Sequence, residues 1–296
     1  MIEPTYAGAA EPERVWFVTS LGLRIHVVEW GDAAAPPLLC CHGFWDHARS
    51  FASLAPLLTG RFRVLAMDAR GHGDSEWAGA YSWQSSIHGV VDVIRALGVP
   101  VHLVGHSMGG GHVTDAARAV PDLVRRVVNI DGFGPPPFTP DEDARLLDRC
   151  AAFLDGRRAA ARRADWRPYA DFAQLVERRR AQNPRLGIDW LRYFVFHAAR
   201  ESPDGWRWKA DPLLAHGFGP WRPEWIGPGY ARVEHPLLAI VGSEPDTWGP
   251  LPEAVVGPRL AGVRRLERAT VADAGHFVHM EQPDATARLI LDFLDA

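Results

Sequence analysis

Short apolar runs that alternate with helical patterns constrain the fold of this chain more than any other feature of its sequence. Most runs are continuously apolar, which is typical of strands buried on both faces of a mainly parallel sheet. In the first two runs, apolar and polar residues alternate, and Leu21-Gly22 lies between the runs. This pattern predicts a β-hairpin. Strands that alternate with helices indicate βαβ units and an α/β fold. The predicted strands are 15–20, 23–31, 36–43, 62–73, 101–106, 124–132, 235–242 and 262–270, and the predicted helices include 83–98, 112–121 and 284–294.

Residues 133–232 interrupt this alternation, because they contain no clear strand and two long helical patterns. An insertion of this size after one strand predicts a helical cap, or lid, domain over a core formed by 1–132 and 233–296. We interpret the arginine-rich stretches 157–163 and 178–180 as solvated helix faces. The tryptophans of this insertion are Trp166, Trp190, Trp206, Trp208, Trp221 and Trp225.

Composition excludes several classes of protein. Apolar residues make up 47% of the 296 residues, enough for a large core, and the net charge of −4 disfavours a nucleic-acid partner. Cys40, Cys41 and Cys150 form neither a disulfide framework nor a zinc-ligand spacing, so we expect no metal and no cofactor. No apolar run has the length of a membrane span, and residues 1–14 lack the pattern of a signal peptide. We therefore expect a cytoplasmic protein without a membrane partner; these features do not define its oligomeric state.

The stretch Gly105-His106-Ser107-Met108-Gly109 follows a predicted strand and precedes a predicted helix. This is the context of the G-x-S-x-G motif, in which a sharp turn forces strained backbone angles on the serine. Glycine on either side removes the collisions that larger side chains would make. The hydroxyl group then projects beside a helix N-terminus, where free N–H groups favour a developing negative charge. Ser107 is therefore the predicted nucleophile.

The predicted general base is His276, which lies on the loop after the last predicted strand. That loop returns to the carboxyl edge of the sheet, where Ser107 is expected. We interpret His279, three residues further on, as a surface residue or a core residue with satisfied hydrogen bonds, without a catalytic role.

Three carboxylates are candidates for the acid that orients the base. Asp246 and Glu244 follow the penultimate predicted strand, and Asp131 follows the strand before it. Our prediction is Asp246, with Glu244 as an alternative. Asp131 is the third option, interpreted as a structural residue that turns the chain into the cap.

The oxyanion formed during acyl transfer needs two N–H donors. The amide of Met108, directly after the serine, is one candidate. The other is the amide of Phe44, in the turn His42-Gly43-Phe44-Trp45 after the third predicted strand, where Gly43 permits a close backbone approach.

Together these features resemble the α/β-hydrolase fold superfamily, and in particular its cap-bearing serine hydrolases. The chain order Ser107, Asp246, His276 is the order of that superfamily. Relatives often carry the acid three residues after the glycine, where this chain has Pro245, so Asp246 follows a second spacing that also occurs. The resemblance implies a mostly parallel eight-stranded sheet with a helical cap inserted after strand 6. Further stretches that look like the superfamily are 42–51, 68–75 and 275–283.

The resemblance also implies hydrolysis of carboxylic esters or lactones through an acyl-enzyme. We expect a small, apolar or aromatic substrate that contacts Trp45, His106, Trp248 and Phe277. Alternatives with the same triad are C–C bond hydrolysis and cofactor-free perhydrolysis, since 107–111 looks like elbows of such enzymes. An alternative of another class is a receptor-like ligand-binding protein that kept the fold.

Overall fold

A computed structural model describes residues 4–162, 165–219 and 222–295. The described residues form an eight-stranded sheet in the order β1-β2-β4-β3-β5-β6-β9-β10. The β1–β2 and β2–β4 pairs are antiparallel, and the other pairs are parallel. All eight predicted strands are confirmed. The strands are β1 (Arg14–Ser20), β2 (Leu23–Trp30), β3 (Pro37–Cys41), β4 (Arg63–Met67), β5 (Val101–His106), β6 (Val124–Ile130), β9 (Leu237–Gly242) and β10 (Leu266–Val271).

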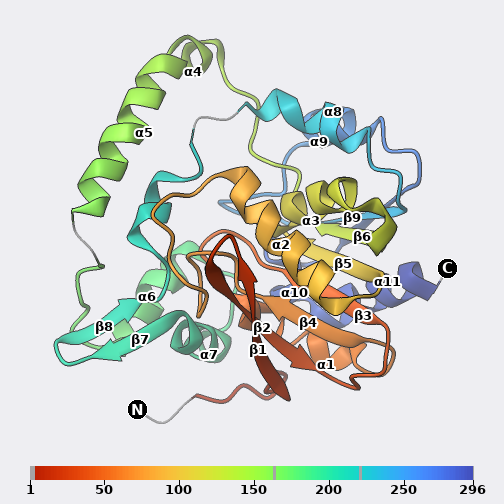
Figure 1. Cartoon of the computed structure of the whole chain (residues 1–296), viewed down its shortest axis with the longest axis horizontal. Coiled ribbons are helices and arrows are strands. Elements are labelled where there is room, and N and C mark those ends of the chain that lie inside the picture. The colour runs from red at the N-terminus through yellow and green to blue at the C-terminus, as the bar shows by residue number, and fades with distance from the viewer. Residues whose placement is uncertain (1–3, 163–164, 220–221, 296) are drawn as a thin grey trace.

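Helices cover both faces of this sheet (Figure 1). Apolar residues of α2, α3 and α9 pack on one face, and those of α1, α10 and α11 pack on the other. Consecutive strand residues point to opposite faces, so Cys40 joins one apolar cluster and Cys41 the other. Both are buried core residues, as the sequence predicts. These helices are α1 (Ala55–Leu58), α2 (Trp83–Leu97), α3 (Met108–Ala119), α9 (Glu253–Leu260), α10 (Val278–Glu281) and α11 (Pro283–Asp295).

The chain between β6 and β9 forms the inserted segment. In Figure 1, α4 and α5 extend away from the sheet at the upper left. Helices α6 and α7 instead contribute buried residues to the apolar cluster on the α11 side of the sheet, so this part of the insertion is continuous with the core. The helices of the segment are α4 (Pro140–Ala144), α5 (Leu146–Ala161), α6 (Phe172–Gln182), α7 (Ile188–Ala198) and α8 (Ile226–Tyr230).

The insertion also contains a hairpin of β7 (Ala199–Ser202) and β8 (Gly205–Trp208), so the expectation of no strand in this segment is wrong. Each strand has only four residues, and β7 follows helix α7 directly, which leaves no alternating apolar pattern to detect. The turn itself has a local signal. Pro203 and Asp204 are followed by Gly205, whose φ of 129° is a backbone conformation that favours glycine.

The parallel strands place several loops at one edge of the sheet. Ser107 directly follows β5, and Asp131 directly follows β6. The loop after β10 carries His276. Because the carboxyl ends of parallel strands meet at the same edge, residues far apart in the sequence converge there.

We predict that Gly109→Ala destabilises the protein by about 1–3 kcal/mol, because the added Cβ would lie 2.1 Å from the backbone oxygen of Cys41 and helix α3 would have to move. Gly60→Ala is the matched control, since nothing lies within 4 Å of its Cβ position. Urea unfolding of both variants and the wild type measures the difference. Equal midpoints for the two variants would show that α3 can shift freely.

Candidate active site

Ser107 occupies the sharp turn between β5 and α3. Its φ of 52° and ψ of −119° lie in a strained region for a residue with a side chain, as the sequence predicts. The turn is held by the Ser107 amide, which donates a hydrogen bond of 2.9 Å to the carbonyl oxygen of Ile130 on β6. A Cβ at Gly105 would lie 2.3 Å from the oxygen of Gly109, so the turn is too tight for a larger residue. The serine side chain lines a pocket at this edge of the sheet.

His276 lies between β10 and α10 and lines the same pocket. Its Nδ1 is 2.6 Å from Oδ2 of Asp131, and because a carboxylate can only accept, Nδ1–H is the donor. Both side chains are buried. A Cβ at Gly249 would lie 2.4 Å from the same Asp131 oxygen, so the loop after β9 closes over this pair and shields it from water.

Asp246, the acid predicted from the sequence, does not reach the His276 ring. Its Oδ1 accepts a hydrogen bond from the Thr247 amide, and its Oδ2 lies 3.4 Å from the backbone nitrogen of His276. Glu244 instead accepts from the hydroxyl group of Ser243.

Backbone geometry explains this difference. Immediately after β6, Asp131 adopts φ 46°, in the left-handed region. In this conformation its carboxylate contacts Nδ1 of the His276 ring. The chain after β9 turns so that Gly249, rather than a carboxylate, lies against the ring. The interpretation of Asp131 as a residue that only turns the chain toward the insertion is therefore corrected: its carboxylate is the one paired with His276.

Two other histidines pack behind His276. His106 is buried, and its Nε2–H donates to the backbone oxygen of His276 over 2.9 Å. His279 is also buried and stacks on Phe51 with ring centroids 4.8 Å apart. Burial lowers the pKa of His279 well below its usual value, so the ring is neutral. His279 is thus a core residue, one of the two positions expected from the sequence, although neither ring nitrogen has a hydrogen-bond partner among the described residues.

The turn after β3 forms another wall of the pocket. Trp45 adopts φ 62°, and Phe44 and Trp45 both line the pocket. A Cβ at Gly43 would lie 2.8 Å from Nδ1 of His106, so this turn packs too closely on His106 for a larger residue. Trp248 and Phe277, also expected at the site, lie there as well. Met108 is the first residue of α3, so its amide belongs to the helix N-terminus, where N–H groups have no intrahelical partner.

The tryptophans of the inserted segment lie mainly elsewhere. The ring of Trp166 packs 5.9 Å from that of Trp45, at the edge of the site. Trp190 and Trp206 are buried in the apolar cluster. Trp221 lies outside the described residues.

Helix α6 contributes polar residues that sequence reasoning missed: Arg179, Gln182 and Asn183 line the pocket. Arg179 is only 5% exposed, so the interpretation of 178–180 as a solvated face is wrong for this residue. The missed signal is its spacing from Phe172, Leu175 and Val176, which places Arg179 on the buried face of the helix.

Arg179 joins α6 to the turn after β3. Its Nη1 donates to the Trp45 carbonyl oxygen over 3.0 Å, and its Nη2 donates to Asp46 Oδ1 over 2.5 Å. Burial alone would raise the pKa of Asp46, but the Arg179 charge and the nearby histidines hold it well below its usual range. Asp46 is therefore ionised, and the two residues form a buried ion pair.

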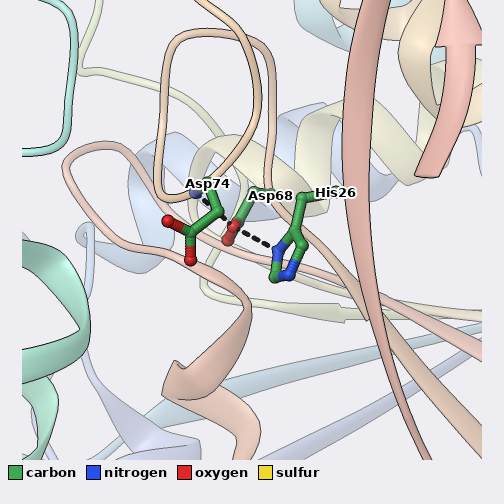
Figure 2. A group of neighbouring side chains, drawn as sticks. All are labelled: His26, Asp68 and Asp74. Atoms are coloured by element: carbon green, nitrogen blue, oxygen red, sulfur yellow. Dashed lines mark hydrogen bonds and ion pairs between the residues drawn. The ribbon is translucent and has the colours of Figure 1, made fainter. Parts of the chain in front are cut away.

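Among the described residues, His26, Asp68 and Asp74 place ligand-type atoms within 4.8 Å of one another. Figure 2 shows these three side chains side by side. These atoms already have protein partners. Asp68 Oδ2 accepts from His26 Nδ1 at 2.7 Å and from the Asp74 amide at 2.8 Å, while Asp68 Oδ1 accepts from the Ala48 amide. Asp74 pairs with Lys209. The cluster is a set of hydrogen bonds that braces the loop after β4, and it does not fit a metal ion.

The strand–serine–helix turn and the buried carboxylate–imidazole pair are arranged as in hydrolases of the α/β type. A sequence model of the alpha/beta hydrolase family matches residues 38–289, so the chain belongs to this family.

Within the described part of the chain, no helix has the length and apolar character needed to cross a membrane.

Curated relatives carry the names of hydrolases. The mouse sn-1-specific diacylglycerol lipase ABHD11 is 29% identical over 277 residues, which cover 90% of this chain and 81% of that protein. The 2-(acetamidomethylene)succinate hydrolase of Mesorhizobium japonicum is 28% identical over 282 residues, covering 93% and 92%. These names support a hydrolase.

Solved structures share the fold over nearly the whole chain. The thioesterase domain from the curacin biosynthetic pathway has a TM-score of 0.80 at 23% identity and covers 94% of this chain and 99% of that one. The E-2-(acetamidomethylene)succinate hydrolase has a TM-score of 0.77 at 25% identity and covers 96% and 99%.

We predict that Arg179→Met destabilises the protein by about 3–5 kcal/mol, because it leaves the Asp46 charge buried and unpaired. Arg180→Met is the matched control, since Arg180 is exposed and forms a surface ion pair with Glu177, an interaction worth at most about 1 kcal/mol. Urea unfolding measures both changes. The double variant Asp46→Asn/Arg179→Met should recover part of the loss, and equal losses for the two single variants would contradict the role of the pair.

Proposed function

We propose that this protein is a serine hydrolase that cleaves carboxylic esters or lactones, with Ser107 as nucleophile, His276 as general base and Asp131 as the acid. The observation that carries the proposal is the 2.6 Å contact between His276 Nδ1 and Asp131 beside a strained serine. When Nδ1–H donates to the carboxylate, Nε2 is the unprotonated nitrogen of the neutral ring and can accept a proton. Ser107 and His276 line one pocket, where that proton is transferred.

In the proposed reaction, Ser107 Oγ attacks the ester carbonyl carbon while His276 Nε2 takes the hydroxyl proton. The carbonyl electron pair moves to oxygen, and the amides of Phe44 and Met108 donate hydrogen bonds to this oxyanion. The tetrahedral intermediate collapses, the bond to the alcohol oxygen breaks, and imidazolium Nε2–H protonates the leaving alcohol. A water molecule then attacks the acyl-enzyme with His276 again as base, which releases the acid and restores Ser107.

Burial gives the proposed acid its effect. Asp131 is 7% exposed and lies beneath Gly249, so its charge acts on the imidazole with little screening by water. A fixed carboxylate at Nδ1 selects the productive tautomer and stabilises the imidazolium form. The His106 side chain also holds His276 in place, because its Nε2–H donates a hydrogen bond to the backbone carbonyl oxygen of His276.

The pocket walls support a small substrate. Aromatic rings of Phe44, Trp45, Trp248 and Phe277 surround the serine, and α6 of the inserted segment supplies the polar part of the lining. We therefore propose that residues 133–232 act as a cap that shapes the substrate pocket. The relative named a diacylglycerol lipase favours ester hydrolysis over the other reactions of this kind of triad.

We predict that Ser107→Ala lowers kcat on p-nitrophenyl esters by about 10⁴-fold or more, because no other side chain supplies the attacking oxygen. The test is the initial rate on esters of increasing acyl length, with wild type and variant side by side. An unchanged unfolding midpoint controls for folding. Ester hydrolysis that persists in the variant would exclude Ser107 as the nucleophile.

We predict that Asp131→Asn lowers kcat by about 10³–10⁴-fold, since the amide favours the wrong imidazole tautomer. Asp246→Asn is the matched control and should change kcat by less than about tenfold, because Asp246 contacts only backbone near the ring. Steady-state kinetics on the best ester compares the two. A larger loss of kcat in Asp246→Asn than in Asp131→Asn would show that the acid is Asp246, on the loop after β9.

A further inference from the structure

Asn183 has an amide side chain without a structural use. It is 2% exposed, and neither Oδ1 nor Nδ2 has a hydrogen-bond partner among the described residues. Its backbone is fully engaged, because its amide donates to the carbonyl oxygen of Arg179 over 3.0 Å and its carbonyl oxygen accepts from Leu186. The side chain therefore adds nothing to the hydrogen bonding that ends helix α6.

Backbone conformation does not require asparagine here either. Asparagine often follows a helix because it tolerates the left-handed region, but Asn183 has φ −130°. A buried amide without partners costs about 1–3 kcal/mol, and such groups are rare in folded proteins. An apolar residue of similar size would avoid this cost, so the amide points to a role outside the fold.

The position of Asn183 indicates that role. Asn183 lines the pocket that holds Ser107 and His276. Arg179 lies one helical turn earlier and lines the same pocket, and its Nε also has no partner among the described residues. The pocket wall formed by α6 and Asn183 therefore carries N–H groups and one carbonyl oxygen without hydrogen-bond partners among the described residues.

The charges of the residues in this pocket wall limit which substrate groups can bind to it. The Arg179 charge is already neutralised by Asp46 within the buried ion pair, and Asn183 is neutral. The other residues of this wall, Gln182 and Asn183, are uncharged, so an additional buried carboxylate would find no second cation there to balance it. A neutral group that both donates and accepts hydrogen bonds matches the unpaired atoms of Asn183 better.

We infer that Asn183 determines substrate specificity and that the substrate carries a secondary amide in its acyl part, near the carbonyl group that is cleaved. The Asn183 Oδ1 accepts from the substrate N–H, and Nδ2–H donates to the substrate amide oxygen. This inference rests on the proposed ester hydrolysis. A plain alkyl chain would leave both Asn183 atoms unpaired, which is the situation that gives hydrogen-bonding pockets their strong selectivity.

The test compares p-nitrophenyl N-acetylglycinate with p-nitrophenyl pentanoate, which have the same leaving group and acyl chains of similar length. The quantity is the amide-to-alkyl ratio of kcat/KM, because comparing this ratio between variants cancels the intrinsic reactivity of each ester. In Asn183→Leu the ratio should fall by about tenfold or more, since two hydrogen bonds are lost. Gln174→Leu, an exposed amide on the same helix, is the matched control and should leave the ratio unchanged.

Folding is controlled within the same series. Asn183→Leu should not lower the unfolding midpoint, because it removes an unpaired buried amide. Asn183→Asp is a second variant that keeps the shape but removes the N–H donor, and it should also lower the ratio. An equal ratio in wild type and both Asn183 variants would overturn the inference.

Failure of the proposed reaction gives a different result. If wild type hydrolyses neither ester, ester hydrolysis is refuted, and Asn183 is tested by the binding of N-acetylglycinamide and pentanamide, followed by NMR titration. Stronger binding of N-acetylglycinamide to wild type and to Gln174→Leu, lost in Asn183→Leu, would support the inference. Absence of that preference, including no binding of either compound, would overturn it.

Discussion

Helix α3 begins so close to the ends of its neighbouring strands that no side chain fits between them. A Cβ at Gly109 would lie 2.1 Å from the oxygen of Cys41 on β3, and one at Gly110 would lie 2.4 Å from the Asn129 side chain on β6. This close approach requires the chain to leave β5 and enter α3 within one residue, which places Ser107 at φ 52°. The strain at the serine is thus a consequence of helix–sheet packing, and the packing in turn fixes where the hydroxyl group and the first amides of α3 lie.

The rest of the site assembles around that fixed point from loops that end parallel strands. His276 is held at two places, because Asp131 binds Nδ1 of its ring and His106 binds its backbone oxygen. His106 immediately precedes Ser107, so the residue beside the nucleophile also positions the loop of the base. Gly249 packs against the outer side of the Asp131–His276 pair, where a larger residue would collide with the Asp131 carboxylate. An imidazole that is bound at Nδ1, on a residue whose backbone oxygen is also bound, keeps its orientation while protons move, which is what preorganised acid–base chemistry needs.

Features set by burial and by local chain direction could be predicted from the sequence. The strands follow from their apolar composition, and Ser107 follows from a strand–helix turn that only small neighbours allow. The acid could not be predicted in the same way, because Asp131, Glu244 and Asp246 all follow a strand at the same sheet edge. The three carboxylates differ in the left-handed φ of Asp131 and in the path of the loop after β9. Neither feature can be recognised from the residue types. The β7–β8 hairpin was missed because strands of four residues are too short to show a period.

Arg179 illustrates how one helix can serve both the fold and the pocket. Its side chain uses Nη1 and Nη2 to hold the turn that carries Phe44 and Trp45, so the inserted segment helps to set the position of a proposed oxyanion donor. Among the described residues, neither its Nε nor the amide of Asn183 has a hydrogen-bond partner, and both residues line the pocket. Polar groups that only stabilise a fold are normally all paired. Binding of a substrate amide at Asn183, as inferred above, would couple substrate recognition to the helix that holds the turn of the proposed oxyanion donor.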